Sequence, residues 1–419
     1  MAKDCGDRLE KMFAGLYESW MVAWETALTT RDENRVERPL EWGFGHLADC
    51  GGLHAAREVA RQEYSPLEAM KALNHRIVAD PESFFAYKTP TDFNIEQRFP
   101  ELHPTNVRPE TLEQEREWQR KAETGELRRE PFLRWSSAVK TGVPENDYAN
   151  ARWYPTPAGT GFVDKRTGYR RRQAIIVMPQ WNADAFSHNA LCEMFNRWGI
   201  ACLRLSKPYH DVRRPAELER SDYAVSSNIG RTIAAARQAV VDVRSAIDWL
   251  ETQGYEQFGV LGTSLGSCYA FLAAAMDPRI AVCAFNHAST WFGDVMWTGQ
   301  STRHVRASLE HAGLTRDDVR AILAGVSPMS FMKEYARGAE RQTLVVHATY
   351  DLTFLRELSV DVLKSFDEYG IPYVSKVLPC GHYTTGEAPY KYLDGWYLGS
   401  FVWSAFRRMA SQRPMKRRA

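Results

Sequence analysis

The sequence lacks any apolar run long enough to span a bilayer, and residues 1–7 carry no apolar core of the kind that a signal peptide requires. It also lacks an excess of charge of one sign, since 53 Lys and Arg residues are balanced by 52 Asp and Glu residues. There is no internal repeat and no low-complexity tract. We therefore expect no binding to membranes and no binding to nucleic acid.

Cysteines are few and scattered, seven in all and none in a C-x-x-C pair. Cys202, Cys268 and Cys283 lie within apolar runs, where a buried free thiol is ordinary. An odd, unpaired set favours a reducing compartment, so a cytoplasmic protein is expected. His46 and His54 do not have the spacing of metal ligands, and we predict no metal and no other cofactor.

The most informative motif is the pentapeptide Gly262-Thr-Ser-Leu-Gly266. It follows a short apolar run at 258–261 and precedes an apolar helical pattern at 268–276. A G-x-S-x-G sequence between a strand and a helix is typical of a nucleophile elbow, which exposes the serine hydroxyl above the sheet. The pentapeptide alone also occurs by chance in ordinary turns, so the remaining residues of a catalytic triad have to be found.

An acid and a histidine follow in the required order. Asp351 comes just after the β-branched run 342–347, and His382 comes just after the predicted strand 371–378. Because parallel strands end at the same edge of a sheet, Ser264, Asp351 and His382 should converge. A serine needs an adjacent imidazole base, and a buried carboxylate orients that imidazole.

Other roles are open for the individual residues. Asp351 is also a suitable helix cap, and Asp367 and Glu387 are alternative acids. His382 also fits a plain loop position. His287, after the apolar run 280–285, is expected to have a structural role or to contact substrate.

An oxyanion hole needs two backbone N–H donors. One should be Leu265, directly after the predicted nucleophile. The other should lie in the loop after the predicted strand 173–178, where we favour Trp181 over Gln180. A plain β–α turn is the alternative for that loop.

Together these motifs make residues 130–411 resemble the α/β-hydrolase superfamily, and within it the dienelactone-hydrolase-like and acetyl-xylan-esterase-like groups. The resemblance implies hydrolysis of a small-molecule carboxylic ester through an acyl-enzyme, without a cofactor. Dienelactone hydrolases use a cysteine where this chain has Ser264, so lactone specificity is not implied.

The apolar runs alternate with helical patterns, which predicts a mostly parallel, doubly wound α/β sheet. We expect two antiparallel edge strands at 132–139 and 148–154, and a long helix at 229–250 before the elbow strand. Residues 131–411 are predicted to form the hydrolase domain. Residues 289–340 should form a helical cap insertion within it.

The cap insertion is rich in aromatic and methionine side chains, which suit an apolar substrate pocket, although they also suit simple packing. The loop 207–211 opens at the same sheet edge and adds two further candidates. Ser330-x-x-Lys333 matches the S-x-x-K pattern without its companion motifs, and we interpret it as chance. The candidate pocket residues are Trp291, Phe292, Met296, Trp297, Tyr209, His210 and His287.

Residues 1–130 are predicted to be a helical extension that either folds over the hydrolase core or mediates homodimer formation. Its first helix is marked by an apolar stripe through Leu9, Met12, Phe13, Leu16, Trp20 and Trp24. Residues 84–109 show no regular pattern, and residues 412–419 form a basic tail.

Several alternative functions fit the same residues. The triad would also serve amide or carbon–carbon bond cleavage, or acyl transfer. A prolyl-oligopeptidase-like peptidase is disfavoured, because its usual partner domain is a β-propeller and residues 1–130 are predicted to be helical. A non-catalytic binding protein would have no need of all three triad residues.

Overall fold

The computed structural model describes residues 2–31, 35–49, 53–62, 65–102, 112–338 and 340–411. The predicted basic tail lies outside these residues, as does the side chain of Leu9. None of the described helices is both long and apolar enough to cross a bilayer.

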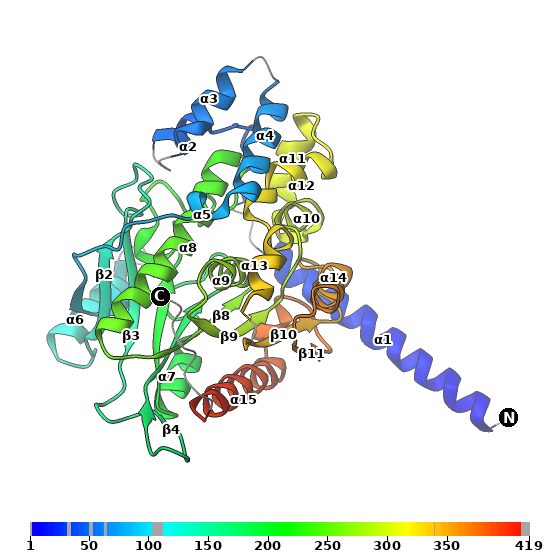
Figure 1. Ribbon diagram of the computed structural model, residues 1–419. Coiled ribbons are helices and arrows are strands. Elements are labelled where there is room, and N and C mark those ends of the chain that lie inside the picture. The colour runs from blue at the N-terminus through cyan, green and yellow to red at the C-terminus, as the bar shows by residue number, and fades with distance from the viewer. Residues whose placement is uncertain are drawn as a thin grey trace.

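A nine-stranded sheet forms the centre of the molecule (Figure 1). Six neighbouring strands run parallel, and the first three along the sheet are antiparallel to their neighbours. This arrangement confirms the predicted fold class. In spatial order the strands are β1 (Asn94–Arg98), β2 (Glu130–Ser136), β3 (Tyr148–Tyr154), β7 (Ile200–Ser206), β6 (Gln173–Met178), β8 (Gln257–Thr263), β9 (Ile280–Asn286), β10 (Gln342–Ala348) and β11 (Val374–Leu378). A separate hairpin pairs β4 (Phe162–Val163) with β5 (Arg170–Arg171).

Helices cover both faces of this sheet, which explains why its central strands are apolar throughout rather than alternating. One core packs α7 (Asn189–Arg197) and α15 (Tyr390–Ala410) against one face. The larger core packs α8 (Ile229–Thr252), α9 (Leu265–Met276) and α14 (Arg356–Glu368) against the other. The candidate site described below lies at the carboxyl ends of the parallel strands.

The insertion after β9 is helical, as predicted. It consists of α10 (Phe292–Thr298), α11 (Arg303–His311), α12 (Arg316–Ile322) and α13 (Met332–Ala336), with short 3-10 turns at Gln300–Thr302, Ala324–Val326 and Pro328–Phe331. The buried Asp294 carboxylate binds Arg316 and Arg320 and ties α10 to α12.

The N-terminal residues pack against this insertion. Lys71 of α4 (Pro66–Ala79) forms an ion pair with Asp318 at 2.8 Å. Asn74 accepts the backbone N–H of Gly325 at 2.8 Å. The other helices of this part are α1 (Ala2–Thr30), α2 (Phe44–Asp49), α3 (Ala55–Arg61), α5 (Pro81–Phe84) and α6 (Leu112–Glu123).

Three expectations about the early elements are wrong in whole or in part. Residues 94–98 are not irregular, because they pair with β2 as the edge strand β1. As a consequence, the strands expected at the sheet edge, β2 and β3, lie inside it. The predicted apolar stripe of α1 packs on the core at Trp24 alone among its described members, and the others are exposed: Met12, Phe13, Leu16 and Trp20.

Candidate active site

The pentapeptide forms a tight turn between β8 and α9. Ser264 has φ 57° and ψ −121°, a strained conformation for a residue with a side chain. A Cβ atom on Gly262 would overlap the backbone of Gly266, and one on Gly266 would overlap the carbonyl oxygen of Met178. Only glycine fits at both places, so the turn depends on the sequence pattern itself.

Replacing Gly266 with alanine is therefore expected to lower the free energy of unfolding by roughly 3 kcal/mol, through overpacking of the turn. Gly395→Ala in α15 is the matched control, since a Cβ there meets nothing within 4 Å. That change should raise the free energy of unfolding by about 0.5–1 kcal/mol, because alanine favours a helix. Urea denaturation of both variants measures the difference, and equal effects would contradict the packing argument.

The structure brings Ser264, His382 and Asp351 into one chain of hydrogen bonds. Ser264 Oγ lies 2.9 Å from His382 Nε2, and His382 Nδ1 lies 2.9 Å from Asp351 Oδ2. Because a carboxylate only accepts, Nδ1 carries the proton and Nε2 is left to accept from the serine hydroxyl. This is the tautomer in which His382 is able to act as a base toward Ser264.

Both carboxylate oxygens of Asp351 accept hydrogen bonds. Its Oδ1 accepts the backbone N–H groups of Thr353 at 2.8 Å and Phe354 at 2.7 Å. Burial favours a higher pKa for the carboxyl, but the charge of His382 and the bonds from His287 and His382 outweigh it, so the pKa of Asp351 lies well below its ordinary value. The carboxylate is therefore charged and rigidly held.

The alternative acids lie elsewhere. Asp367 is exposed at the end of α14, where its carboxylate accepts the hydroxyl of Tyr373 at 3.4 Å. Glu387 is exposed after the 3-10 turn Thr384–Gly386. Among the hydrogen bonds of the described residues, only Asp351 reaches His382 with a carboxylate.

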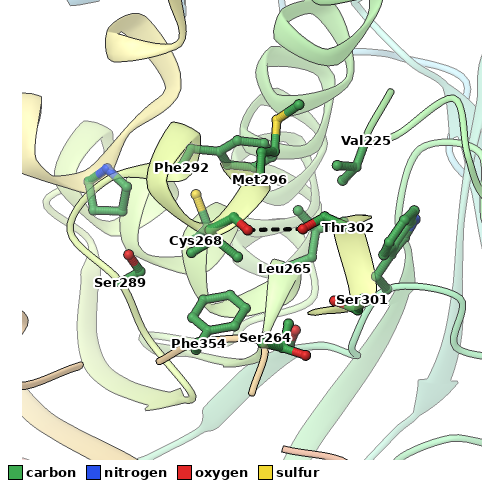
Figure 2. Close-up of a pocket in the computed structure, with 14 residues that line it drawn as sticks. Val225, Ser264, Leu265, Cys268, Ser289, Phe292, Met296, Ser301, Thr302 and Phe354 are labelled. Carbon is green, nitrogen blue, oxygen red and sulfur yellow. Dashed lines mark hydrogen bonds between the residues drawn. The ribbon is translucent and has the colours of Figure 1, made fainter. Parts of the chain in front are cut away.

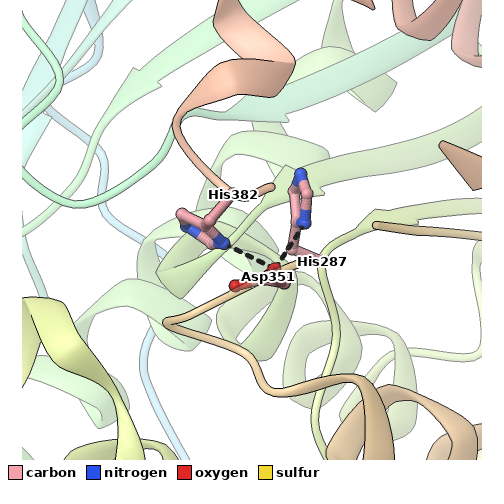
Figure 3. A group of neighbouring side chains, drawn as sticks. All are labelled: His287, Asp351 and His382. Atoms are coloured by element: carbon pink, nitrogen blue, oxygen red, sulfur yellow. Dashed lines mark hydrogen bonds and ion pairs between the residues drawn. The ribbon is translucent and has the colours of Figure 1, made fainter. Parts of the chain in front are cut away.

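A second histidine shares the carboxylate of Asp351 (Figure 3). His287 follows β9, has φ 57°, and places Nδ1 2.9 Å from the same Oδ2 that His382 contacts. Burial and then the charge of His382 lower the pKa of His287, which keeps its ring neutral. Its Nε2 is buried and has no partner among the described residues. His287 thus acts on the site through Asp351.

These three side chains also have the spacing of metal ligands, with one ligand atom from each within 4.8 Å of the others. Each of those atoms is already engaged: both Nδ1 atoms bind Asp351, and His382 Nε2 binds Ser264. The hydrogen-bond chain accounts for the arrangement without a metal ion.

Two residues with unpaired backbone N–H groups, among the described residues, line the pocket of Ser264. Trp181 and Leu265 line the same pocket as Ser264, and in the described residues neither N–H has a hydrogen-bond partner. Gln180 is not part of this lining, and its carbonyl oxygen accepts Lys207 Nζ at 2.9 Å. Of the two candidates in this loop, Trp181 is the one beside Ser264.

Hydrogen bonds from the loop after β7 hold the loop that contains Trp181. His210 Nε2 accepts the backbone N–H of Asn182 at 3.2 Å. Trp181 Nε1 donates to the Ser221 carbonyl at 3.0 Å, and Ser221 N–H donates back to Asn182 Oδ1 at 2.7 Å. His210 is therefore buried beneath the loop rather than in the pocket, and Tyr209 packs against Tyr223.

A largely apolar pocket of about 480 Å³, including its mouth, opens at Ser264 (Figure 2). Its few other hydroxyls include Thr302 Oγ1, which donates to the Val295 carbonyl, and Ser289 Oγ, which donates to the Trp291 carbonyl. No charged side chain lines it. The lining residues are Trp181, Val225, Ser264, Leu265, Cys268, Ser289, Phe292, Val295, Met296, Ser301, Thr302, Pro328, Thr353 and Phe354.

Of the predicted cap residues, Phe292 and Met296 line the pocket, whereas Trp291 and Trp297 do not. Trp291 lies under Arg320 and Trp297 under Arg306, with cation-to-ring distances of 5.4 and 5.3 Å. Sequence reasoning missed Phe354, whose ring stacks on His382 at 5.3 Å. Its position three residues after Asp351 was the available signal.

A family described as "Alpha/beta hydrolase domain containing 18" matches residues 181–373, a span that includes Ser264 and Asp351 and ends before His382. This span is less than half of the chain, so the match is a similarity to that family, while the sheet described above has the arrangement of the α/β-hydrolase fold.

Individual similarities are distant. An uncharacterized 31.7 kDa Escherichia coli protein from the traX-finO intergenic region is 37% identical over 82 residues. Those residues are 19% of this chain and 28% of that protein, so the chain spans little more than a quarter of this relative's length.

Among solved structures, acetyl xylan esterase 1 from Thermoanaerobacterium sp. JW/SL YS485 is similar with a TM-score of 0.51 and 12% identity, over 81% of this chain and 94% of that chain. The acetyl xylan esterase from Paenibacillus sp. R4 has a TM-score of 0.47 and 11% identity, over 80% and 95%. At these identities the first likeness shows the fold alone.

Proposed function

We propose that this chain hydrolyses carboxylic esters that carry an uncharged, apolar acyl group, through an acyl-enzyme formed on Ser264. The observation that carries the proposal is the hydrogen-bonded chain Ser264–His382–Asp351 at the wall of an apolar pocket. A serine becomes a useful nucleophile only beside a base, and here the base has its free nitrogen aimed at the hydroxyl.

In the first step, Ser264 Oγ attacks the ester carbonyl carbon while its proton passes to His382 Nε2. The electron pair of the carbonyl moves to oxygen, and the N–H groups of Leu265 and Trp181 bind the resulting oxyanion. The oxyanion collapses, the carbon–oxygen bond to the alcohol breaks, and His382 returns its proton to the leaving alkoxide. Asp351 stabilises the imidazolium in between.

In the second step, water attacks the acyl-Ser264 carbonyl while His382 Nε2 takes a proton from it. The tetrahedral oxyanion forms again and collapses, the bond from the acyl carbon to Ser264 Oγ breaks, and His382 returns its proton to Oγ, which restores the hydroxyl and releases the carboxylic acid. The limited apolar pocket supports an acyl group of short to medium length as the part of the substrate that it holds.

Turnover of p-nitrophenyl esters from acetate to decanoate tests this proposal. We expect hydrolysis with a maximum at a short or medium acyl chain and a burst of p-nitrophenol as the acyl-enzyme forms. Turnover of an acyl-anilide series instead of the esters would favour amide cleavage. Transfer of the acyl group from Ser264 to an added alcohol, giving a new ester in preference to the carboxylic acid, would favour acyl transfer.

Met296→Ala is expected to shift this preference toward longer acyl chains, because Met296 is buried in the pocket wall. Relative to acetate, kcat/KM for the octanoate ester should rise about 10-fold, the discrimination that a change of one or two methylenes typically gives. Met276→Ala is the control, since Met276 packs on the same core outside the lining. An equal shift in both variants would contradict the assignment of the pocket.

A further inference from the structure

A buried carboxylate on the first helix contacts the loop that carries His382. Glu25 of α1 is fully buried. Its carboxylate accepts the backbone N–H of Tyr383 at 2.9 Å and that of Thr384 at 3.0 Å, and it also accepts the Thr384 hydroxyl at 3.1 Å. No salt bridge reaches Glu25 in the described part of the chain, so these donors alone compensate its charge.

The loop is shaped around this carboxylate. A Cβ atom on Gly381 would overlap the Glu25 side chain, so only glycine allows the approach. Thr384 Oγ1 accepts the N–H of Gly381 at 2.6 Å while it donates to Glu25. His382 therefore lies between two residues whose backbone conformation depends on Glu25.

A second contact fixes α1 next to the same loop. The Tyr17 hydroxyl donates to the carbonyl of Pro379 and lies 2.6 Å from the hydroxyl of Tyr390. Tyr17, Met21 and Glu25 are spaced by four residues and share one helix face. That face is turned toward the site, while the earlier part of α1 extends away from the body (Figure 1).

We propose that Glu25 is a positioning residue of the active site, through which the N-terminal helix holds the His382 loop in its reactive geometry. Glu25 lies outside residues 131–411, the predicted hydrolase domain, so the proposal gives the N-terminal extension a part in catalysis. It rests on the esterase function proposed above.

The charge of Glu25 also acts on His382. Burial lowers the pKa of His382, but the charge and hydrogen bond of Asp351, together with the charge of Glu25, outweigh burial and raise it. Among the described residues, His287 and Tyr383 are the other titratable groups whose rings lie against His382. Because the base form of His382 is the active one, removing the charge of Glu25 should move the acid limb of kcat/KM to lower pH.

The test compares Glu25→Gln and Glu25→Asp with Glu18→Gln, an acid-to-amide control at an exposed position of the same helix. With p-nitrophenyl butyrate, Glu25→Gln should lower kcat about 10²-fold with little change in KM, since a small displacement of a catalytic group has that effect. Glu25→Asp keeps the charge and should recover part of the loss. Glu18→Gln should match the unmodified protein in kcat and pH profile.

A proton NMR measurement separates this proposal from the esterase function. The unmodified protein should show low-field Nδ1 proton signals from His287 and His382, and Glu25→Gln should shift or broaden the His382 signal. If the unmodified protein turns over no ester, the proposed function fails while this spectrum still tests Glu25. A folded Glu25→Gln with unchanged kcat, pH profile and spectrum would overturn the positioning role and leave Glu25 as a packing residue.

Discussion

Replacing Ser264 with alanine is expected to lower kcat for p-nitrophenyl butyrate on the order of 10⁶-fold. The change removes the oxygen that His382 Nε2 contacts, while the alanine keeps the Cβ atom of Ser264. The N–H donors of Leu265 and Trp181 remain, so a residual rate above that in water should persist.

Ser330→Ala is the matched control for this loss. Ser330 belongs to the S-x-x-K match, and its hydroxyl donates to the Ala324 carbonyl. We expect nearly full activity from that variant. Binding of an ester analogue to Ser264→Ala, measured by calorimetry, should be retained. Unchanged turnover in Ser264→Ala would show that the reaction, if any, proceeds at another group.

Asp351→Asn is expected to lower kcat about 10⁴-fold. The amide oxygen carries no full negative charge, so it accepts the Nδ1–H bonds of His287 and His382 more weakly than the carboxylate does. His382 then loses the partner that selects its tautomer and stabilises its imidazolium.

The Asp351→Asn variant should also shift the pH profile of kcat/KM in a defined direction. Asp351 raises the pKa of His382 against the effect of burial. Removing its charge should therefore lower the pKa of His382 and shift the acid limb of kcat/KM to lower pH. Asp367→Asn is the control, because Asp367 is exposed and does not contact His382. A loss in Asp367→Asn equal to that in Asp351→Asn would contradict the choice of acid.

The positions of Ser264, Asp351 and His382 are accessible to sequence reasoning for a simple physical reason. Each directly follows an apolar strand, and the carboxyl ends of parallel strands meet at one edge. The glycines around Ser264 add a steric signal, since the turn excludes any side chain at Gly262 and Gly266. Both signals are local in sequence.

Features that depend on packing between distant segments are less accessible. The edge strand β1 contains one apolar residue, Ile95, which is exposed, so no hydrophobic alternation marks it. Glu25 contacts residues more than 350 positions away, and only its spacing with Tyr17 and Met21 hints at a buried face. Most of the apolar stripe that the sequence predicts on α1 is instead exposed.

The residues that line the pocket are predictable from the sequence in part. Phe292 and Met296 are four residues apart and share one face of α10, whereas Trp291 and Trp297 flank that helix section on other faces. Helical spacing therefore separates the lining residues from the aromatic side chains that lie under Arg320 and Arg306. The sequence allows His287 either a structural role or a contact with substrate, and its bond to Asp351 has no signal in the sequence.

The nucleophile itself is tested most directly by labelling the purified protein with a fluorophosphonate and locating the adduct by peptide mass spectrometry. The account predicts one adduct on the peptide that contains Ser264. Labelling should be abolished in Ser264→Ala and retained in Ser330→Ala. An adduct on another residue, or a well-folded protein that neither reacts with the probe nor turns over any ester, would contradict the assignment of Ser264 as the nucleophile.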